Sequence, residues 1–349
     1  MDSLTQALLG AVVQGSLLGR FQGRKALLYG AALGTLPDMD VLLDFGDAVG
    51  QLTYHRGFSH SIFLITAFSL LLAWLVRRFR PEAGYGMQRL FACVWLVLAT
   101  HVFIDTCTTY GTQVFWPLPV APANLTNIFV IDPLYSLPLL LGVLLALFSG
   151  LGGAGWRALN WALGLSSLYM LSSFVSQAVM TERFEAVLRE EGIASEQRLV
   201  MPTPGNTLLW RLLVLDGERY CEGLSGWFDR KAPQLVCRTR GLELRGLVAD
   251  SAAHQRLSWF NGGYMAYREE QGQLVVTDLR LGLLGSHSFQ FVLAQRDASG
   301  QWQLNDWVAS LPMGFGSPAS RALLWQRLWG DEGDFSALLN YRPEGASAE

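Results

Sequence analysis

Residues 58–76 read FSHSIFLITAFSLLLAWLV, and apart from one histidine near the start they hold only apolar and hydroxyl side chains. A helix needs about 20 predominantly apolar residues, and at least about 17, to cross the hydrocarbon core of a bilayer. Other apolar segments are shorter or less uniform. The candidate spans cover residues 7–19, 26–43, 58–76, 90–109, 133–149 and 158–179. We therefore predict a polytopic α-helical membrane domain of about six helices over residues 1–180.

Charge divides the chain into two parts. Only 16% of the 349 residues are charged, against roughly 25% in an ordinary soluble domain. Residues 1–180 hold nine Lys or Arg and eight Asp or Glu, whereas residues 181–349 hold seventeen and twenty-one. Such a step marks a boundary between a bilayer domain and a water-exposed domain. The net charge of -3 argues against nucleic-acid binding, because that function normally shows a basic stripe.

The second half has the pattern of a β-rich domain. A charged helix is predicted near its start, over residues 182–191. Short apolar or alternating runs, separated by Gly, Asp and Asn, then indicate strands. These runs cover residues 208–215, 242–248, 273–281 and 289–296. We predict that residues 181–349 form a β-rich α+β soluble domain.

Four polar or reactive side chains of this second half are candidate functional groups. His254 and His287 lie in polar surroundings and are interpreted as surface residues. Cys221 and Cys237 are able to form a disulfide if the domain lies in an oxidising compartment. None of the four cysteines belongs to a C-x-x-C pair, which excludes a thiolate zinc site of that type.

The basic residues of the first half predict its orientation. Arg56 lies in a loop on one side of the predicted bundle, and the other eight basic residues lie on the opposite side. Those eight are Arg20, Arg24, Lys25, Arg77, Arg78, Arg80, Arg89 and Arg157. Loops rich in Lys and Arg stay in the cytoplasm. We therefore predict a multi-pass inner-membrane protein whose N terminus and C-terminal domain lie outside the cytoplasm.

Ionisable side chains gather at the predicted outer ends of the apolar segments. His101 and Asp105 are four residues apart, which places them on one helix face, about one turn from each other. His55 and His60 converge best if His55 lies in a loop and His60 in the first helical turn, with Ser59 as the N-cap. Ionisable groups in such a place usually pair with each other, bind an ion or perform chemistry.

A further acidic pair follows Pro37. The residue before a proline disfavours the helical conformation, so the preceding helix should end near Leu36 and leave Asp38 and Asp40 in an irregular segment. Mixed imidazole and carboxylate ligands suit a borderline divalent metal, zinc first and manganese as the alternative. The predicted ligands of one or two such ions are Asp38, Asp40, His55, His60, His101 and Asp105.

The same residues allow a hydrolytic mechanism. A bound divalent ion would lower the pKa of a water molecule and polarise the scissile group. A carboxylate that does not bind the metal, Asp40 or Asp38, would accept the proton. Arg56 is interpreted as a clamp for a substrate phosphate, because guanidinium suits phosphate geometry; an ion pair with the acids is its alternative role.

Three other interpretations stay open. The histidines and acids could be hydrogen-bonded packing groups, since a single histidine in an apolar helix more often packs than binds a metal. They could line a proton or cation pathway in an ion-coupled transporter. The membrane domain could also be an anchor for a soluble half that binds a protein partner, whose identity the sequence does not indicate.

These motifs resemble the bacterial inner-membrane metal-dependent hydrolase family, also called the YdjM/LexA-binding family. The resemblance covers roughly residues 1–180. Its motifs are the N-terminal MDSLTQ with Gly10, LPDMD at 36–40, HRGFSH at 55–60, HVFID at 101–105 and IDP at 131–133. One departure is Gln6, which stands where the family pattern often has histidine. A neutral amide is a poor zinc ligand, so that corner of the site is expected to be altered.

The resemblance implies a membrane-bound hydrolase with His and Asp metal ligands and leaves the substrate undefined. A site at the membrane face favours an amphiphilic substrate, such as a phospholipid or a lipid-linked phosphate. Membrane lipids are accordingly the expected partners.

Overall fold

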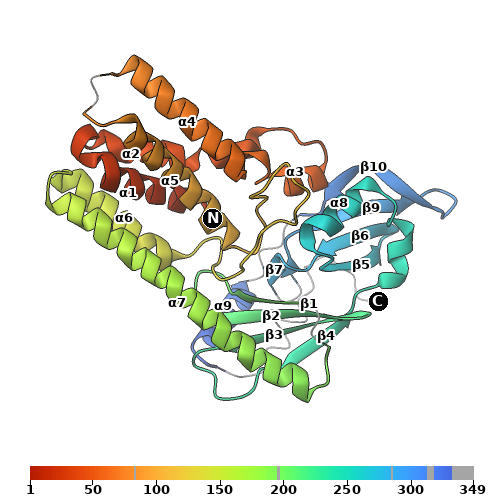
Figure 1. Ribbon diagram of the computed structural model, residues 1–349. Helices are drawn as coiled ribbons and strands as arrows, with labels where there is room; N and C mark the ends of the chain where they lie inside the picture. Colours follow the sequence, from red (N-terminus) through yellow and green to blue (C-terminus); the bar gives the residue numbers. More distant parts are fainter. Residues whose placement is uncertain (82–83, 195–196, 284–285, 313–317, 332–349) are drawn as a thin grey trace. The chain divides into compact units, whose positions relative to one another are not determined.

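The computed structural model describes residues 1–81, 84–194, 197–283, 286–312 and 318–331, and they form two compact units (Figure 1). Unit 1 comprises Met1–Asp44, Tyr54–Phe174 and Pro204–Asn206. Unit 2 comprises Phe45–Thr53, Val175–Thr203 and the described residues from Thr207 onward. The predicted domain boundary near residue 180 and the unit boundary after Phe174 both fall inside one long helix.

Unit 1 is helical. Its α-helices are α1 (Ser3–Gln22), α2 (Lys25–Thr35), α4 (Ile62–Phe79), α5 (Met87–Thr106), α6 (Pro133–Ser149) and the first part of α7 (Ala154–Glu190), with 3-10 helices η1 (Pro37–Leu42) and η2 (Phe58–His60). The Asp2 side chain caps α1 by accepting from the Thr5 amide, and Asp132 caps α6 by accepting from the Leu134 and Tyr135 amides. Both caps satisfy amide groups that a helix start leaves unpaired.

The prediction of about six spans is confirmed only in part. Three helices of the described residues are long and apolar enough to cross a membrane: α4, α5 and α7. Helix α6 is apolar but has only 17 residues. The segment predicted as a span over residues 26–43 contains the 11-residue α2 followed by η1, because Pro37 stands at the junction.

Helices α1 and α2 pack backbone to backbone. A Cβ added at Gly10 would lie 2.2 Å from the Gly30 carbonyl oxygen, and one added at Gly30 would lie 2.2 Å from the Gly10 carbonyl oxygen. Gly34 approaches the Gln6 carbonyl in the same way. Small residues permit this close contact, and it fixes the position of α2, from which η1 and its two acids continue.

Unit 2 contains the β structure, so the predicted β-rich C-terminal part is confirmed. One antiparallel sheet has the order β1 (Gln197–Pro202), β2 (Leu209–Asp216), β3 (Arg219–Gly226), β4 (Leu235–Thr239). The second has the order β10 (Trp302–Ser310), β9 (Gln290–Arg296), β6 (Gln273–Asp278), β5 (Met265–Glu270), and β7 (Gly282–Leu283) pairs with β8 (Ser286–His287). The helices of this unit are the end of α7, α3 (Ala48–Tyr54), α8 (Ala252–Asn261) and α9 (Pro318–Leu328).

Strand β2 is buried on both faces. Trp210, on one face, packs in a cluster with Met180 and Phe184 of α7, whereas Leu213, on the other face, packs with Leu279. The charged segment predicted as a separate helix over residues 182–191 is therefore the end of α7, and it covers the first sheet. Cys221 and Cys237 lie opposite each other on β3 and β4 and form a disulfide.

Two predictions for unit 2 are wrong. Residues 242–248, predicted as a strand, contain the 3-10 helix η3 (Leu242–Leu247), which begins after Gly241 in the left-handed conformation. His254 and His287 are buried, not at the surface. The His254 ring contacts the Tyr267 hydroxyl at 2.8 Å, and His287 lies 3.8 Å from Glu222.

Buried charges link the two sheets of unit 2. Arg211 on β2 pairs with Glu222 on β3 and donates to the carbonyl oxygens of Leu279 and Gly282. Arg280 pairs with Asp278 and Arg327 pairs with Asp229, so these buried charges also have partners of opposite sign, as such groups require.

Candidate metal centre

The acidic pair enters the site from η1. Pro37 stands at the first position of this 3-10 helix, where its missing amide costs nothing. A 3-10 helix has about three residues per turn, so side chains two positions apart point in different directions. Asp38 and Asp40 therefore face different neighbours, although both were predicted as metal ligands.

The segment from His55 to His60 also reaches the site. Arg56 adopts a φ of 58°, and its amide donates to Asp40 Oδ2 at 3.0 Å. A Cβ at Gly57 would lie 2.7 Å from the Tyr54 carbonyl oxygen, so this sharp turn requires glycine. The turn places the buried His60 at the end of η2.

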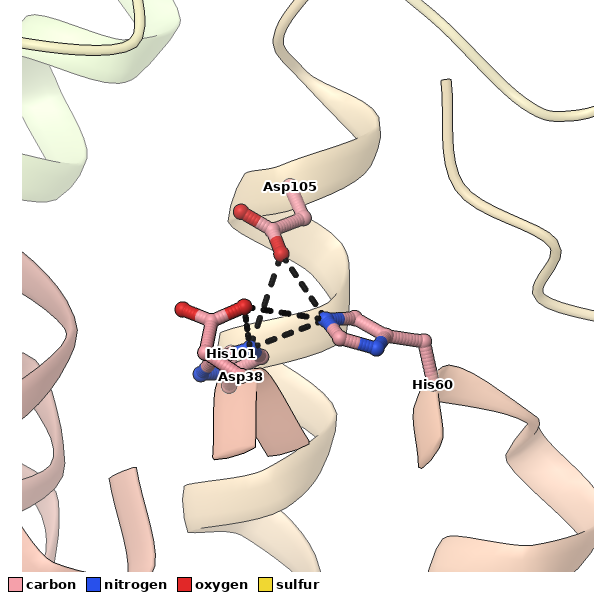
Figure 2. Close-up of side chains that lie close together, drawn as sticks. All are labelled: Asp38, His60, His101 and Asp105. Atoms are coloured by element: carbon pink, nitrogen blue, oxygen red, sulfur yellow. Dashed lines mark hydrogen bonds and ion pairs between the residues drawn. The ribbon is translucent and has the colours of Figure 1, made fainter. Parts of the chain in front are cut away.

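Helix α5 contributes His101 and Asp105. Both side chains are buried and lie on one face of the helix, as the spacing predicted. Figure 2 shows Asp105 and His101 one turn apart, with Asp38 and His60 approaching them from separate segments.

Asp38, His60, His101 and Asp105 form the only group of at least three His, Cys, Asp or Glu side chains in the described residues whose ligand atoms converge: the four atoms lie within 4.8 Å of one another (Figure 2). The Nε2 atoms of His60 and His101 are 3.1 Å apart. His60 Nε2 lies 3.1 Å from Asp105 Oδ2, and His101 Nε2 lies 3.5 Å from the same oxygen. Asp38 Oδ1 lies 3.5 Å from each of the two nitrogens.

These separations match a four-coordinate ion. Zinc bonds of about 2.05 Å in a tetrahedron place neighbouring ligand atoms about 3.3 Å apart. Five of the six distances within the cluster lie between 3.1 and 3.5 Å. Asp38 Oδ1 is also buried and accepts no hydrogen bond from the described residues. The donor set and its spacing therefore fit one divalent cation.

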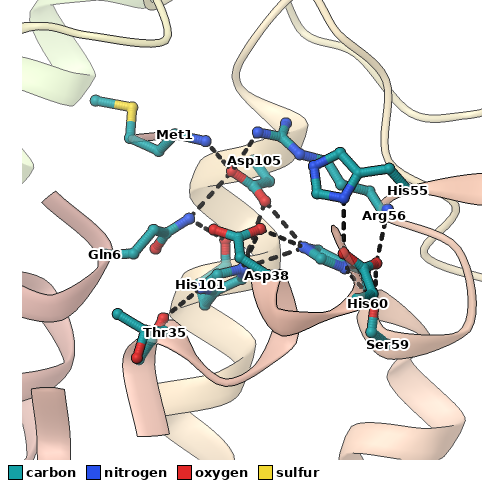
Figure 3. A network of polar contacts seen from close by, with 12 residues as sticks. Met1, Gln6, Thr35, Asp38, His55, Arg56, Ser59, His60, His101 and Asp105 are labelled. Carbon is teal, nitrogen blue, oxygen red and sulfur yellow. Dashed lines mark hydrogen bonds and ion pairs between the residues drawn. The ribbon is translucent and has the colours of Figure 1, made fainter. Parts of the chain in front are cut away.

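Contacts behind each imidazole determine which nitrogen carries the proton. His101 Nδ1 lies 2.6 Å from the Gly34 carbonyl oxygen, which only accepts, so Nδ1 donates. Ser59 Oγ donates to Asp40 Oδ2 at 2.5 Å and is 2.9 Å from His60 Nδ1, so that nitrogen donates as well (Figure 3). Neutral imidazoles in this tautomer direct both Nε2 lone pairs at the centre of the cluster, the arrangement typical of metal ligands.

The second oxygen of Asp105 is held by three donors. Asp105 Oδ1 accepts from the Met1 amino group and, at 3.0 Å, from Gln6 Nε2 (Figure 3). Arg56 Nη2 lies 3.3 Å from the same oxygen. Gln6 thus orients a carboxylate and does not take part in the converging group. The three donors leave Oδ2 to face the two imidazoles.

Asp40 and His55, both predicted ligands, lie beside the four converging residues. Asp40 Oδ1 contacts His55 Nδ1 at 2.7 Å, and its other oxygen accepts from the Arg56 amide and from Ser59. The His55 side chain is 20% exposed, whereas the His60 side chain is fully buried. Asp40 therefore connects the partly exposed imidazole to the serine behind His60.

Arg56, predicted as a phosphate clamp, is buried next to the cluster. Its guanidinium contacts Asp105, donates to Thr108 Oγ1 at 3.1 Å and lies over the Tyr110 ring. Its Nε is buried and has no hydrogen-bond partner among the described residues. This N–H is a donor available for a bound molecule.

The acids attract positive charge to the site. Burial alone would raise the pKa of Asp38, but the His101 and His60 imidazoles, each 3.5 Å from its Oδ1, outweigh burial and hold that pKa well below its usual range. Burial alone would lower the pKa of His60, but the neighbouring Asp105 and Asp38 carboxylates outweigh burial and raise that pKa above its usual value. Burial likewise opposes ionisation of Asp40, and the hydrogen bonds from His55 and Ser59 lower its pKa. The cluster is electrostatically suited to a cation.

Sequence reasoning missed the role of Ser59. It was predicted to cap the following helix, but that helix begins after Ser61, and Ser59 instead bridges His60 and Asp40. The sequence shows that Ser59 stands directly before His60. The bridge itself depends on a tertiary contact with Asp40, which the sequence does not reveal. The Gly34 carbonyl was also missed, since backbone acceptors leave no residue-type signal.

Comparisons with known proteins agree with a membrane location. Residues 1–180 match the family model described as YdjM inner membrane protein. "Uncharacterized protein YfhP" of Bacillus subtilis (strain 168) is 25% identical over 234 residues, which cover 64% of this chain and 68% of YfhP. "Inner membrane protein YbcI" of Escherichia coli (strain K12) is 37% identical over 97 residues, 27% of this chain and 54% of YbcI. No solved structure matches the chain.

Proposed function

Because the chain belongs to the YdjM inner membrane protein family and brings four ligand atoms from three segments together, we propose that it is a membrane-bound metal-dependent hydrolase. The observation that carries the proposal is the convergence of two Nε2 lone pairs and two carboxylate oxygens within 4.8 Å, with no proton between the nitrogens. Four buried acceptors facing one point repel each other unless a cation lies among them.

We propose Asp38, His60, His101 and Asp105 as the ligands of one ion, with zinc first and manganese as the alternative. Nitrogen and oxygen donors at tetrahedral spacing favour zinc. Because four protein ligands fill a tetrahedral site, activation of water would require the ion to accept a further ligand; bound there, it would supply Lewis-acid chemistry.

The neighbouring residues have roles in this proposal. His55 is partly exposed, and Asp40 holds its Nδ1 at 2.7 Å, so its Nε2 is free to accept a proton while Asp40 stabilises the imidazolium. Asp40 was predicted to accept the proton by itself; we propose that it does so together with His55. Arg56 Nε would donate to an anionic substrate oxygen beside the cluster.

The substrate class follows from the surroundings. The cluster lies at the end of the apolar helix α5, beside the start of the apolar helix α4. We propose an amphiphilic ester or phosphate, such as a phospholipid or a lipid-linked phosphate, cleaved at the outer face of the inner membrane. The basic-residue distribution supports an outer location for the site and the C-terminal domain. The Cys221–Cys237 disulfide supports an oxidising compartment for that domain.

The test uses the full-length chain purified in detergent. We expect about one zinc or manganese per chain and metal-dependent release of phosphate or fatty acid from phospholipid vesicles. His60→Ala and Asp105→Ala should lose both the metal and the turnover. His254→Ala removes a buried histidine of unit 2 and should keep both.

Two results would refute the hydrolase. Stoichiometric metal with cation flux in liposomes and no turnover of any lipid would favour an ion-coupled transporter. Full turnover by metal-free protein, or by His60→Ala, would mean that the four-residue cluster is not the reaction centre.

A further inference from the structure

Unit 1 has a large groove whose lining contains none of the four converging His and Asp residues. Its volume is about 1120 Å³, comparable to the larger ligand sites of proteins, and residues of α1, α2, α4 and α5 line it. The greater part of its wall is apolar, with Leu33 and Leu36 on the α2 side and Phe68 and Leu72 on the α4 side. We call this space the α2–α4 groove.

One end of the α2–α4 groove is basic. Lys25, at the start of α2, and Arg80, just after α4, both line it and are exposed. Within the described residues, neither forms a salt bridge, and the lining of the groove contains no Asp or Glu. Two cations that line an apolar groove are electrostatically complementary to a single anionic head group.

Next to this basic end, a row of polar side chains lines the wall. Gln14 Nε2 donates to Gln22 Oε1 at 3.0 Å, and Gln22 Nε2 donates to the Tyr85 hydroxyl at 3.0 Å. Gln14 is 2% exposed, and its Oε1 has no hydrogen-bond partner among the described residues. A buried amide oxygen without a donor is costly, so this wall is built to receive an O–H or N–H group.

The polarity of the groove wall changes along α2. The basic end is at Lys25, and the groove reaches Leu36 at the other end of the helix, two residues before Asp38. Eleven helical residues span about 16 Å, roughly half of the hydrocarbon thickness. A lipid with its head group at the metal cluster would place its terminal methyl groups against glutamines and cations. In the reverse orientation, the polar head group lies against the glutamines and cations, and the acyl chain lies against the apolar wall.

We propose that the α2–α4 groove is a binding site for an anionic phospholipid whose head group carries hydroxyls. The phosphate contacts Lys25 and Arg80, a head-group hydroxyl donates to Gln14 Oε1, and one acyl chain lies along Leu33 and Leu72 toward Leu36. The lipid belongs to the leaflet at the basic helix ends, so it is distinct from the molecule cleaved at the cluster. This site goes beyond the proposed hydrolase and does not require it.

The experiment titrates the full-length chain in detergent micelles with phosphatidylglycerol that carries a fluorescent acyl chain, and with phosphatidylcholine of the same chains. Phosphatidylglycerol should bind at one site, at least about tenfold more tightly. The double variant Lys25→Gln/Arg80→Gln should weaken it by roughly 30-fold, the effect of two cations on an anionic lipid. Arg78→Gln/Arg157→Gln makes the same charge change outside the groove and should leave binding within about threefold.

Two further arms test the groove itself. Ala32→Trp fills the apolar wall and should abolish binding while the unfolding temperature of the protein stays near that of the wild type. Glycerol phosphate should not displace the lipid, because it lacks the acyl chain. Equal affinity for the two lipids, or equal loss in both double variants, would overturn the proposal. So would binding by a folded Ala32→Trp protein, or displacement by glycerol phosphate. Metal content, measured on the same samples, tests the hydrolase separately.

Discussion

Ser59 is the residue whose contribution is most easily isolated, because it touches the cluster without belonging to it. Its hydroxyl accepts from His60 Nδ1 and donates to Asp40, so it fixes the tautomer and the orientation of the imidazole. We expect Ser59→Ala to lower zinc affinity by about 10- to 100-fold, the usual effect of removing such a partner. Competition with a fluorescent zinc chelator measures this affinity.

The control for Ser59 lies in α4. Ser69 is fully buried, and its hydroxyl donates to the Ile65 carbonyl within the same helix. Ser69→Ala should keep wild-type affinity. Equal affinities for Ser59→Ala and Ser69→Ala would mean that the hydrogen bond behind His60 does not organise the cluster.

At the residue scale, the sequence predicted the side chains of the cluster better than their contacts. The spacing of His101 and Asp105 sufficed, because a helix places such residues on one face. The sequence could not show that Asp38 joins the converging group and Asp40 does not, since this depends on the 3-10 conformation of η1. The position of His55 outside the converging group depends on the turn at Gly57, which is fixed by a close backbone contact.

Among the elements, α2 matters most, because it carries the Gly34 carbonyl and leads into η1. Its close packing on α1 leaves no space for a side chain at Gly30. We expect Gly30→Ala to destabilise unit 1 by roughly 1–3 kcal/mol through overpacking and to lower metal content, because α2 must move away. Thermal unfolding in detergent and metal analysis check both effects.

A second glycine provides the comparison. A Cβ at Gly164 in α7 would meet no atom within 4 Å. Gly164→Ala should therefore be neutral or slightly stabilising, since alanine favours the helix by roughly 0.5–1 kcal/mol. Equal unfolding temperatures for the two variants would contradict the packing described for α1 and α2.

Element boundaries were the least predictable part of the fold. Hydropathy alone extended the second apolar segment to residue 43, whereas α2 ends at Thr35 and the chain continues as a 3-10 helix. Alternating residues 242–248 suggested a strand, but left-handed Gly241 starts a 3-10 helix there. In both places one proline or glycine outweighed a longer apolar pattern.

At the scale of the whole molecule, all four converging ligands belong to unit 1. A chain truncated after Gly192, just beyond α7, should therefore keep about one metal ion. The same truncation with Asp105→Ala should keep none. Loss of metal from the first protein, with its helical circular dichroism retained, would mean that unit 2 is needed to form the centre.

Unit 2 should lose stability in acid. The pKa of His287 is lowered to about 4, chiefly by burial; the Glu222 carboxylate opposes this shift and the Arg211 guanidinium adds to it. Below the ordinary histidine pKa of about 6.5, the unfolded chain therefore binds more protons than the folded chain. The stability of unit 2 is fully present above that pH and falls toward pH 4. Between pH 7.5 and 5.0 we expect a loss of about 2 kcal/mol. Urea unfolding at the two pH values measures it.

The variant His287→Gln isolates this effect, because glutamine does not titrate. Its stability should change less between the same two pH values. An equal loss in both proteins would assign the acid sensitivity to other groups.

X-ray absorption spectroscopy of the zinc-loaded, full-length protein tests the central claim most directly, because it reports the atoms bound to the ion. We predict a first shell of nitrogen and oxygen only, at about 2.0–2.1 Å, with the outer-shell scattering of two imidazole rings. A sulfur shell, or a zinc spectrum without imidazole scattering, would contradict a centre formed by Asp38, His60, His101 and Asp105.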